Sequence, residues 1–168
     1  EARDRVSAAI KNSGFKSPKQ TNSKIVVSLA PADIKKEGPI FDLPIALGYL
    51  LATGEIDFDT ENKMFVGELS LDGKVKSITG ALSYARLAQM KDIQEIYVPK
   101  ENAPEAALIE NVVVYGIESL TEIIKHLDIS KRTGAEHVEI KPSASKIPTG
   151  SNEKERFDHD FDDVVGQE

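Results

Sequence analysis

The residues that could carry a reaction are few and dispersed along the chain. Its 168 residues include no cysteine, which excludes cysteine nucleophiles, thiolate metal sites and disulfides. The three histidines, His126, His137 and His159, lack the spacing of a zinc site, so no metal site is predicted. Ser143 and Lys146 match the S-x-x-K pattern of serine nucleophiles without its companion motifs. They also lie in a polar segment that is too flexible to hold a nucleophile against its base.

The stretch GELSLDGK, Gly67 to Lys74, superficially resembles a phosphate loop. Such a loop needs four residues between its glycines and a Ser or Thr after its lysine. Here five residues intervene and Val75 follows the lysine. The pair Asp72-Gly73 between two apolar runs is instead typical of a β-hairpin turn. The hairpin interpretation is favoured, and no nucleotide or other cofactor is expected in this chain.

Four carboxylates lie at or beside predicted turns: Glu37, Asp42, Glu68 and Asp72. Such residues either cap helices and form turns, or pair as a general acid and base whose geometry the sequence alone does not provide. The structural interpretation is favoured. Gly38 and Pro39 are expected to form a turn beside Glu37, and Asp42 is expected to cap the helix that follows.

Predicted strands and helices alternate along the first 130 residues. Amphipathic or apolar runs bounded by capping residues and glycines predict helices over 1–13, 41–53, 80–90, 103–109 and 120–127. Runs rich in β-branched residues predict strands over 24–30, 64–70, 74–78, 95–98 and 112–115. This alternation, with one hairpin at Asp72-Gly73, predicts a mixed α/β domain.

Composition limits the partners. Residues 131–167 have the Pro, Gly and Ser content of a linker, and seven acidic residues stand against two basic ones from Ser151 onward. Most of the net charge of -7 therefore lies in this tail, and the nearly neutral body lacks the basic footprint of a nucleic-acid-binding protein. No apolar run approaches the roughly 20 residues of a membrane span, so no membrane partner is expected. The lack of cysteine fits a cytoplasmic protein.

Several stretches resemble, in order, one known family. They are EARDRVSAAIKNSGF, VSLAPADIKKEGPIFDLPIALGYLLATGEI, FVGELSLDGKVKSITGALSYA, IYVPKENAPEAALIENVVVYGIESLTEII and FDDVVGQE. Together they are similar to the N-terminal domain of the magnesium-chelatase-subunit-like AAA+ ATPases, the YifB or ComM family. The resemblance covers nearly all of the chain except about residues 131–156.

This resemblance implies a Lon-protease-like domain over residues 1–129, with further strands expected before residue 1. The fold is the α/β (α+β) fold shared with a ribosomal-protein second domain and GHMP kinases, a mixed sheet with a hairpin and packed helices. Residues 130–168 are then a flexible linker and the start of the connection to an AAA+ core that binds ATP and Mg²⁺. The parent is expected to be a ring-forming, hexameric ATPase that acts on branched DNA during transformation.

The resemblance also locates two positions of a lost catalytic dyad. Lon carries its serine nucleophile just after an Asp-Gly-Pro turn and its lysine base early in the helix after the hairpin. Here Glu37-Gly38-Pro39 matches the turn, and Ile40 and Leu82 fall at the serine and lysine positions. Neither side chain donates, accepts or attacks, so this chain is not expected to be an enzyme. If the dyad has been filled with apolar packing, Ile40 and Leu82 should lie close together and be buried.

Three hypotheses follow. The leading one is a non-catalytic assembly or regulatory domain. The second is a DNA-binding module, by analogy with the recombination protein RadA, whose phosphate contacts would be Lys35, Lys36, Lys74 and Lys76. Solvated turn lysines are favoured over this, because the body is nearly neutral. The weakest is an altered peptidase using Glu37, Asp42 or Ser83.

Overall fold

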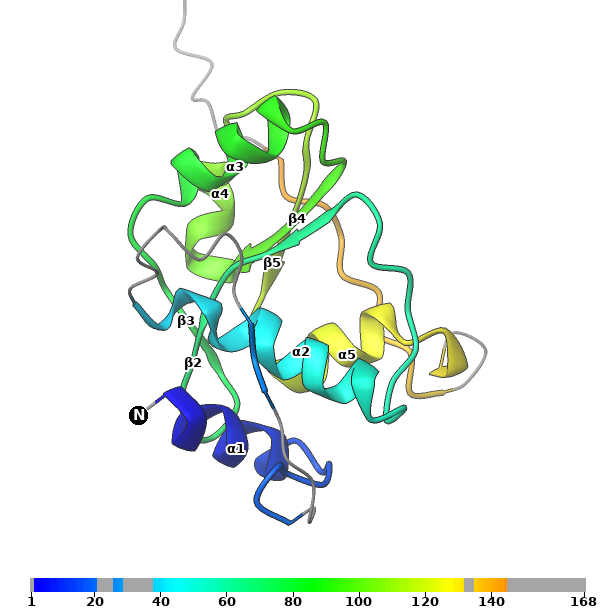
Figure 1. Cartoon of the computed structure of the whole chain (residues 1–168). Helices are drawn as coiled ribbons and strands as arrows, with labels where there is room; N and C mark the ends of the chain where they lie inside the picture. The colour runs from blue at the N-terminus through cyan, green and yellow to red at the C-terminus, as the bar shows by residue number, and fades with distance from the viewer. Residues whose placement is uncertain (1, 21–25, 29–37, 132–134, 145–168) are drawn as a thin grey trace, which may run out of the picture.

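The centre of the domain is a parallel sheet of three strands. The computed structural model describes residues 2–20, 26–28, 38–131 and 135–144. The strands β1 (Lys63–Phe65), β4 (Glu95–Pro99) and β5 (Val113–Ile117) lie in the order β1-β4-β5 (Figure 1). The middle strand β4 is apolar and almost wholly buried, as expected for a strand that is covered on both faces.

Helices α3 (Ala81–Met90) and α4 (Ala103–Ala106) cover one face of this sheet. The buried side of α3 consists of Ala81, Ala85 and Ala88 at helical spacing. Because these side chains are small, the helices approach the sheet closely enough to pack on Ile96 and Val98 of β4.

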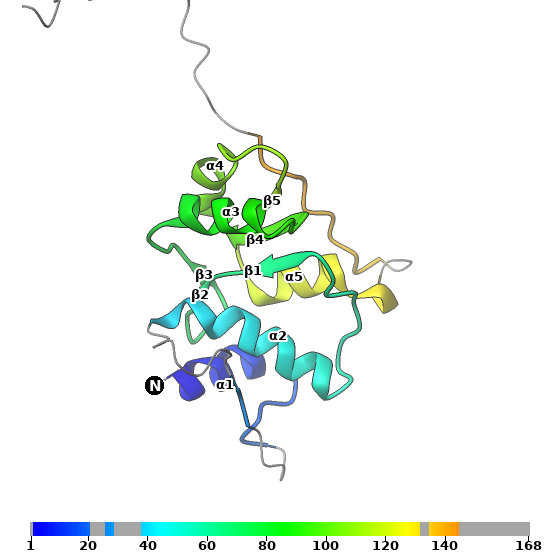
Figure 2. The ribbon, with the colours of Figure 1, turned by 45° about the horizontal axis from the view of Figure 1, so that its top comes forward.

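The opposite face of the sheet has larger side chains and is covered by two layers of helices. Helices α2 (Asp42–Ala52) and α5 (Leu120–Leu127) pack on it, and α1 (Ala2–Asn12) packs against α2 on the far side (Figure 2). The rings of Phe65, Tyr97 and Tyr115 stack across the three strands on this face, with centroids 5.0 and 4.8 Å apart. Alternation along β4 thus sends Tyr97 to one core cluster and its neighbours Ile96 and Val98 to the other.

A two-stranded antiparallel hairpin, β2 (Glu68–Leu69) and β3 (Val75–Lys76), lies apart from this sheet. Gly73 in its turn has φ +84°, a conformation that favours glycine. The hairpin is anchored beyond itself, because the Val75 N–H donates to the Glu118 carbonyl and the Leu120 N–H donates to that of Gly73. Three 3₁₀ turns complete the described part, at Pro39–Phe41, Lys100–Asn102 and Ile129–Lys131.

The mixed α/β class and most elements confirm the sequence prediction. The expected hairpin turn at Asp72-Gly73 is present, and Ser119 caps α5 by accepting from the Glu122 N–H at 3.1 Å. The single strand predicted over 64–70 is wrong, because β1 and β2 belong to different sheets. Of the strand predicted over 24–30, only residues 26–28 are described, and they form no strand.

Part of the predicted linker is packed on the domain. We call residues 135–144 the strap, which runs from α5 along the outer edge of β5 (Figure 1). Ile140 is 9% exposed and belongs to the same core cluster as α2 and α5. The Ser143 N–H donates to the Val114 carbonyl at 2.8 Å, and Pro142 forms an isolated bridge with Tyr115. The strap therefore covers an edge of the sheet.

Candidate functional site

The turn that precedes α2 is shaped by two glycines. Gly38 has φ +98°, and Pro39 then starts the 3₁₀ turn that carries Ile40. Gly67, between β1 and β2, donates its N–H to the Ile40 carbonyl at 3.0 Å and accepts from the Leu43 N–H at 3.1 Å. A Cβ on Gly67 would lie 2.8 Å from Cγ1 of Val75, so only glycine permits this approach. The predicted turn at Gly38-Pro39 is present, and Glu37 lies outside the described residues.

Ile40 and Leu82, the two positions that the family resemblance matches to the dyad, have different environments. Ile40 is half-buried and packs against the core cluster that contains Ala81 and Val66. Leu82 in the first turn of α3 is 38% exposed, and its backbone N–H donates to Oε1 of Glu105 at 3.3 Å. The condition set for a dyad filled with apolar packing, that both side chains are buried, is therefore not met, because Ile40 is only half-buried and Leu82 is exposed. The reason is its phase on α3, where Ala81 and Ala85 take the inward positions.

Asp42 does not cap α2, contrary to the sequence prediction. It is the first residue of the helix, the N-cap position is Phe41, and no side chain caps this end. The Asp42 carboxylate is 1% exposed and points across to α1, where Arg5 donates from Nε to Oδ2 at 2.8 Å and from Nη2 to Oδ1 at 3.3 Å. The Leu69 N–H donates to the same Oδ2 at 3.4 Å. The acceptors are taken by this ion pair instead of the helix N-terminus.

The contacts of the described residues weaken the peptidase hypothesis. Asp42 has both oxygens in a buried ion pair, so it is not placed to accept a proton from a substrate or nucleophile. Ser83 is exposed on α3, and its side chain shows no hydrogen bond to a base. Neither of the two cavities described below is lined by Gly38 or Pro39.

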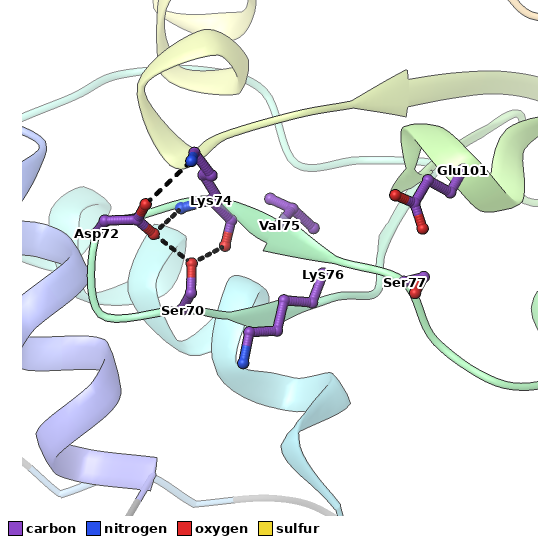
Figure 3. A pocket seen from close by; sticks show the side chains of 7 residues that line it. All are labelled: Ser70, Asp72, Lys74, Val75, Lys76, Ser77 and Glu101. Atoms are coloured by element: carbon purple, nitrogen blue, oxygen red, sulfur yellow. Dashed lines mark hydrogen bonds and ion pairs between the residues drawn. The ribbon is translucent and has the colours of Figure 1, made fainter.

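The hairpin lysines border an open, mixed-charge cavity of about 540 Å³ (Figure 3). Lys74 pairs with Asp72 at 3.3 Å between Nζ and Oδ2, and Lys76 pairs with Glu68 at 3.5 Å. Figure 3 shows the Lys74 ammonium directed toward Asp72 at the turn, while the Lys76 side chain points away from both. Each positive charge thus has a carboxylate beside it, which weakens a phosphate-binding interpretation. Lys35 and Lys36, the other two predicted DNA contacts, lie outside the described residues.

Asp72 acts as a turn former in this cavity. The Ser70 hydroxyl donates to Oδ1 of Asp72 at 2.5 Å, and the Lys74 backbone N–H approaches the same oxygen at 3.4 Å. These hydrogen bonds, with the Ser70 hydroxyl contributing most, hold the pKa of Asp72 below its ordinary value. A carboxylate that is harder to protonate is a poorer general base, so Ser70 and Asp72 are assigned to the turn.

A second cavity, of about 470 Å³, opens between the sheet, α5 and the strap. It brings together His126 of α5 and His137 of the strap, whose ring centroids are 6.4 Å apart. Lys63, Glu95 and Glu139 also line it, and the Tyr97 hydroxyl donates to Oε2 of Glu95 at 2.8 Å. Burial, followed by the negative charge of Glu95, raises the pKa of Tyr115 above its ordinary value. Within the described residues, no three His, Asp or Glu side chains are arranged to hold a metal ion.

Sequence reasoning missed two features of this framework. Arg5 was treated only as part of an amphipathic helix, and no local signal connects it with Asp42, which is 37 residues away. The docking of Ile140 was hidden by the Pro and Ser residues that follow it, although the large apolar residues Val138 and Ile140 in a polar segment were a usable signal.

Among the described residues, no helix combines the length and apolarity needed to cross a membrane. His126 and His137 are the two histidines that the structure describes, and His159 lies outside the described residues.

Comparison with known proteins gives a consistent assignment. The family model described as subunit ChlI of Mg-chelatase matches residues 1–102. Competence protein ComM of Haemophilus influenzae is 36% identical over the whole chain, and the uncharacterized protein YifB of Escherichia coli is 37% identical over the whole chain. The matched regions are 31% and 30% of those proteins, so the chain spans about a third of their length.

A more distant similarity is to a protease. Lon protease 2 of Bacillus subtilis is 27% identical over 114 residues, which is 66% of this chain and 20% of that protein. Because the family model matches more than half of the chain, the assignment rests on that match and not on the Lon similarity. The chain belongs to the family of subunit ChlI of Mg-chelatase, with relatives that include ComM and YifB.

Proposed function

We propose that this domain is a non-catalytic assembly or regulatory part of an AAA+ ATPase that forms a hexameric ring and acts on DNA in the cytoplasm. Family membership and the greater length of ComM and YifB support an ATPase core outside this chain, which would bind ATP and Mg²⁺. The similarity to Lon protease 2 supports a Lon-protease-like fold, of the type shared with GHMP kinases, for the domain itself.

The observation that carries the proposal is the apolar turn before α2. Its shape is maintained by Gly38 and by the two hydrogen bonds to Gly67, yet the side chain that it presents is Ile40, packed against the core. A turn that delivered a nucleophile would need a reactive group and a base beside it. The hydrogen-bonded backbone of this turn instead supports a structural role, in which the turn maintains the shape of the domain.

The test uses the intact parent protein and a variant that lacks residues 1–129. ATP hydrolysis and native mass are measured for both, and peptide hydrolysis is measured for the intact protein. We expect no peptide hydrolysis and a loss of ring assembly, or of regulated ATP hydrolysis, in the deletion variant. Peptide hydrolysis that disappears on substituting a residue of this domain would overturn the proposal, as would a deletion that changes neither assembly nor ATP hydrolysis.

DNA contact by this domain is the runner-up. The names of the relatives do not specify it, and the ion pairs of Lys74 and Lys76 weaken it. Fluorescence anisotropy of the 168-residue chain with forked DNA at low salt decides the matter. Salt-dependent binding that falls in a Lys74→Ala, Lys76→Ala double variant would favour this alternative. The matched control is a Lys16→Ala, Lys19→Ala variant, whose substitutions lie outside the hairpin and should leave any such binding unchanged.

A further inference from the structure

The strap is fastened to the end of α5 by two histidines that use the same ring atom in different ways. His126 in the last turn of α5 places its Nδ1 3.2 Å from the Ile140 nitrogen. His137 on the strap places its Nδ1 3.1 Å from the Lys125 carbonyl oxygen. The first contact involves a backbone N–H of the strap, and the second involves a backbone carbonyl of α5.

The contact of His126 requires a neutral imidazole. The Ile140 N–H is a donor, so Nδ1 of His126 must accept, and the proton of the neutral ring must therefore be on Nε2. The Val138 carbonyl oxygen lies 3.3 Å from the same Nδ1. One nitrogen cannot accept from Ile140 and donate to Val138 at once. The contact with Val138 therefore belongs to a ring with a hydrogen on Nδ1, which is either the other neutral tautomer or the imidazolium.

The contact of His137 is indifferent to protonation. A carbonyl oxygen only accepts, so Nδ1 of His137 carries a hydrogen whether the ring is neutral or cationic. The two histidines are thus a matched pair, in which only His126 loses a contact when it gains a proton. Protonation of both rings would also place two cations in stacked rings whose centroids are 6.4 Å apart.

Charged and titratable groups lie around His126 on every element packed against it. Lys63, Glu95, Tyr97 and Tyr115 face the cavity from the sheet, and His137 and Glu139 face it from the strap. Lys125 precedes it on α5. The carboxylates Glu95 and Glu139 favour the imidazolium, while Lys63 and Lys125 disfavour it. Glu95 is already shared between Lys63, at 3.8 Å, and the Tyr97 hydroxyl.

We propose that His126 is a pH-operated latch on the strap. The neutral ring holds the Ile140 amide, and protonation converts Nδ1 from an acceptor to a donor that faces the Val138 carbonyl. The Ile140 N–H then has no acceptor. Two neighbouring contacts weaken with it: the hydrogen bond from the Ser143 N–H to the Val114 carbonyl, and the packing of the Ile140 side chain in the core.

The test measures amide hydrogen exchange and imidazole ¹⁵N shifts by NMR on the 168-residue chain. Free imidazoles titrate near about pH 6.5, so spectra are compared between about pH 7.5 and about pH 5.5. At the higher pH, His126 should be the Nε2–H tautomer and His137 the Nδ1–H tautomer. On acidification, protection of the Ile140 and Ser143 amides should fall about tenfold, while protection of the Leu47 and Leu50 amides in α2 stays constant.

Two matched variants isolate the latch. His126→Asn places a non-titrating acceptor near the position of Nδ1, so protection of Ile140 should no longer depend on pH. His137→Asn places a non-titrating donor opposite the Lys125 carbonyl, and the dependence should persist. The proposal is overturned if His126 is the Nδ1–H tautomer at pH 7.5, if Ile140 keeps its protection on acidification, or if His126→Asn leaves the dependence unchanged. The tautomer measurement decides even where a variant does not fold.

Discussion

Asp42 and Asp72, two carboxylates at predicted turns, differ in burial: the first is buried and the second is exposed. The Asp42 side chain is 1% exposed and links α1 to α2 through Arg5, whereas Asp72 is exposed and interacts with Ser70 and Lys74 in the hairpin turn. Both are acidic residues near glycines at predicted turns, and the sequence favours a structural role for both. The sequence therefore predicts that such a residue lies at a turn. How much it contributes to the stability of the fold depends on the residues from elsewhere in the chain that pack beside it.

The largest expected effect comes from Asp42→Ala. Removing this carboxylate leaves the Arg5 guanidinium and the Leu69 N–H without their acceptor, inside the interface between two helices. Breaking a buried pair by deleting one partner costs about 3 kcal/mol of unfolding free energy. Urea denaturation followed by circular dichroism measures the loss.

The matched control is Asp72→Ala, for which the urea midpoint should move far less, because exposed ion pairs contribute little. Equal losses in the two variants would contradict the contrast between buried and exposed turns.

Gly67→Ala is expected to have the next largest effect. Its new methyl group would meet Cγ1 of Val75 at 2.8 Å and press on Leu43, in the segment that holds the Ile40 turn. Overpacking of this kind costs about 1–3 kcal/mol. Differential scanning calorimetry should show a lower melting temperature.

Gly48→Ala is the control for that substitution. Gly48 lies exposed in α2 with nothing within 4 Å of an added Cβ, so alanine should stabilise the helix by about 0.5–1 kcal/mol. A loss of stability in both variants would mean that the close approach at Gly67 is not what limits the turn.

The sequence predicted the features that depend on neighbouring residues and missed those that depend on contacts between distant segments. The hairpin turn at Asp72-Gly73 depends on neighbouring residues and was predicted correctly. The strand over 64–70 was predicted as one because its apolar run is continuous. It is divided at Val66 and Gly67, because Gly67 bonds to Ile40 and Leu43 about 25 residues earlier, and such pairings leave no periodic signal.

The family resemblance matches Ile40 and Leu82 to the serine and lysine positions of a Lon-type dyad, but it gives no information on the burial of either side chain. Helical phase would have helped, since the inward row of α3 is Ala81, Ala85 and Ala88, and Leu82 lies off that row. The Arg5–Asp42 pair and the strap needed the structure, because both join segments that are distant in sequence.

The two dyad positions should respond differently to the same substitution. Ile40→Ser removes a half-buried apolar side chain from the cluster that contains Val66 and should cost about 1–2 kcal/mol. Leu82→Ser changes an exposed residue and should stay within about 0.5 kcal/mol. Chemical denaturation compares the two. A larger loss at Leu82 would mean that α3 presents that side chain to the core, contrary to the structure.

The smallest expected effect concerns the exposed turn, and it is measured as a pKa. The Ser70 hydroxyl is the main cause of the lowered pKa of Asp72, so Ser70→Ala should raise that pKa toward its ordinary value of 3.8. A carboxyl whose pKa is lower in the folded state contributes stability that is present above about pH 3.8 and is lost as the pH falls through the folded pKa. The variant should therefore lose part of this contribution at neutral pH and show a weaker decline in stability on acidification below that value. Side-chain ¹³C NMR of Asp72 reports the pKa directly, and an unchanged value would show that the Lys74 amide, not the hydroxyl, holds the turn.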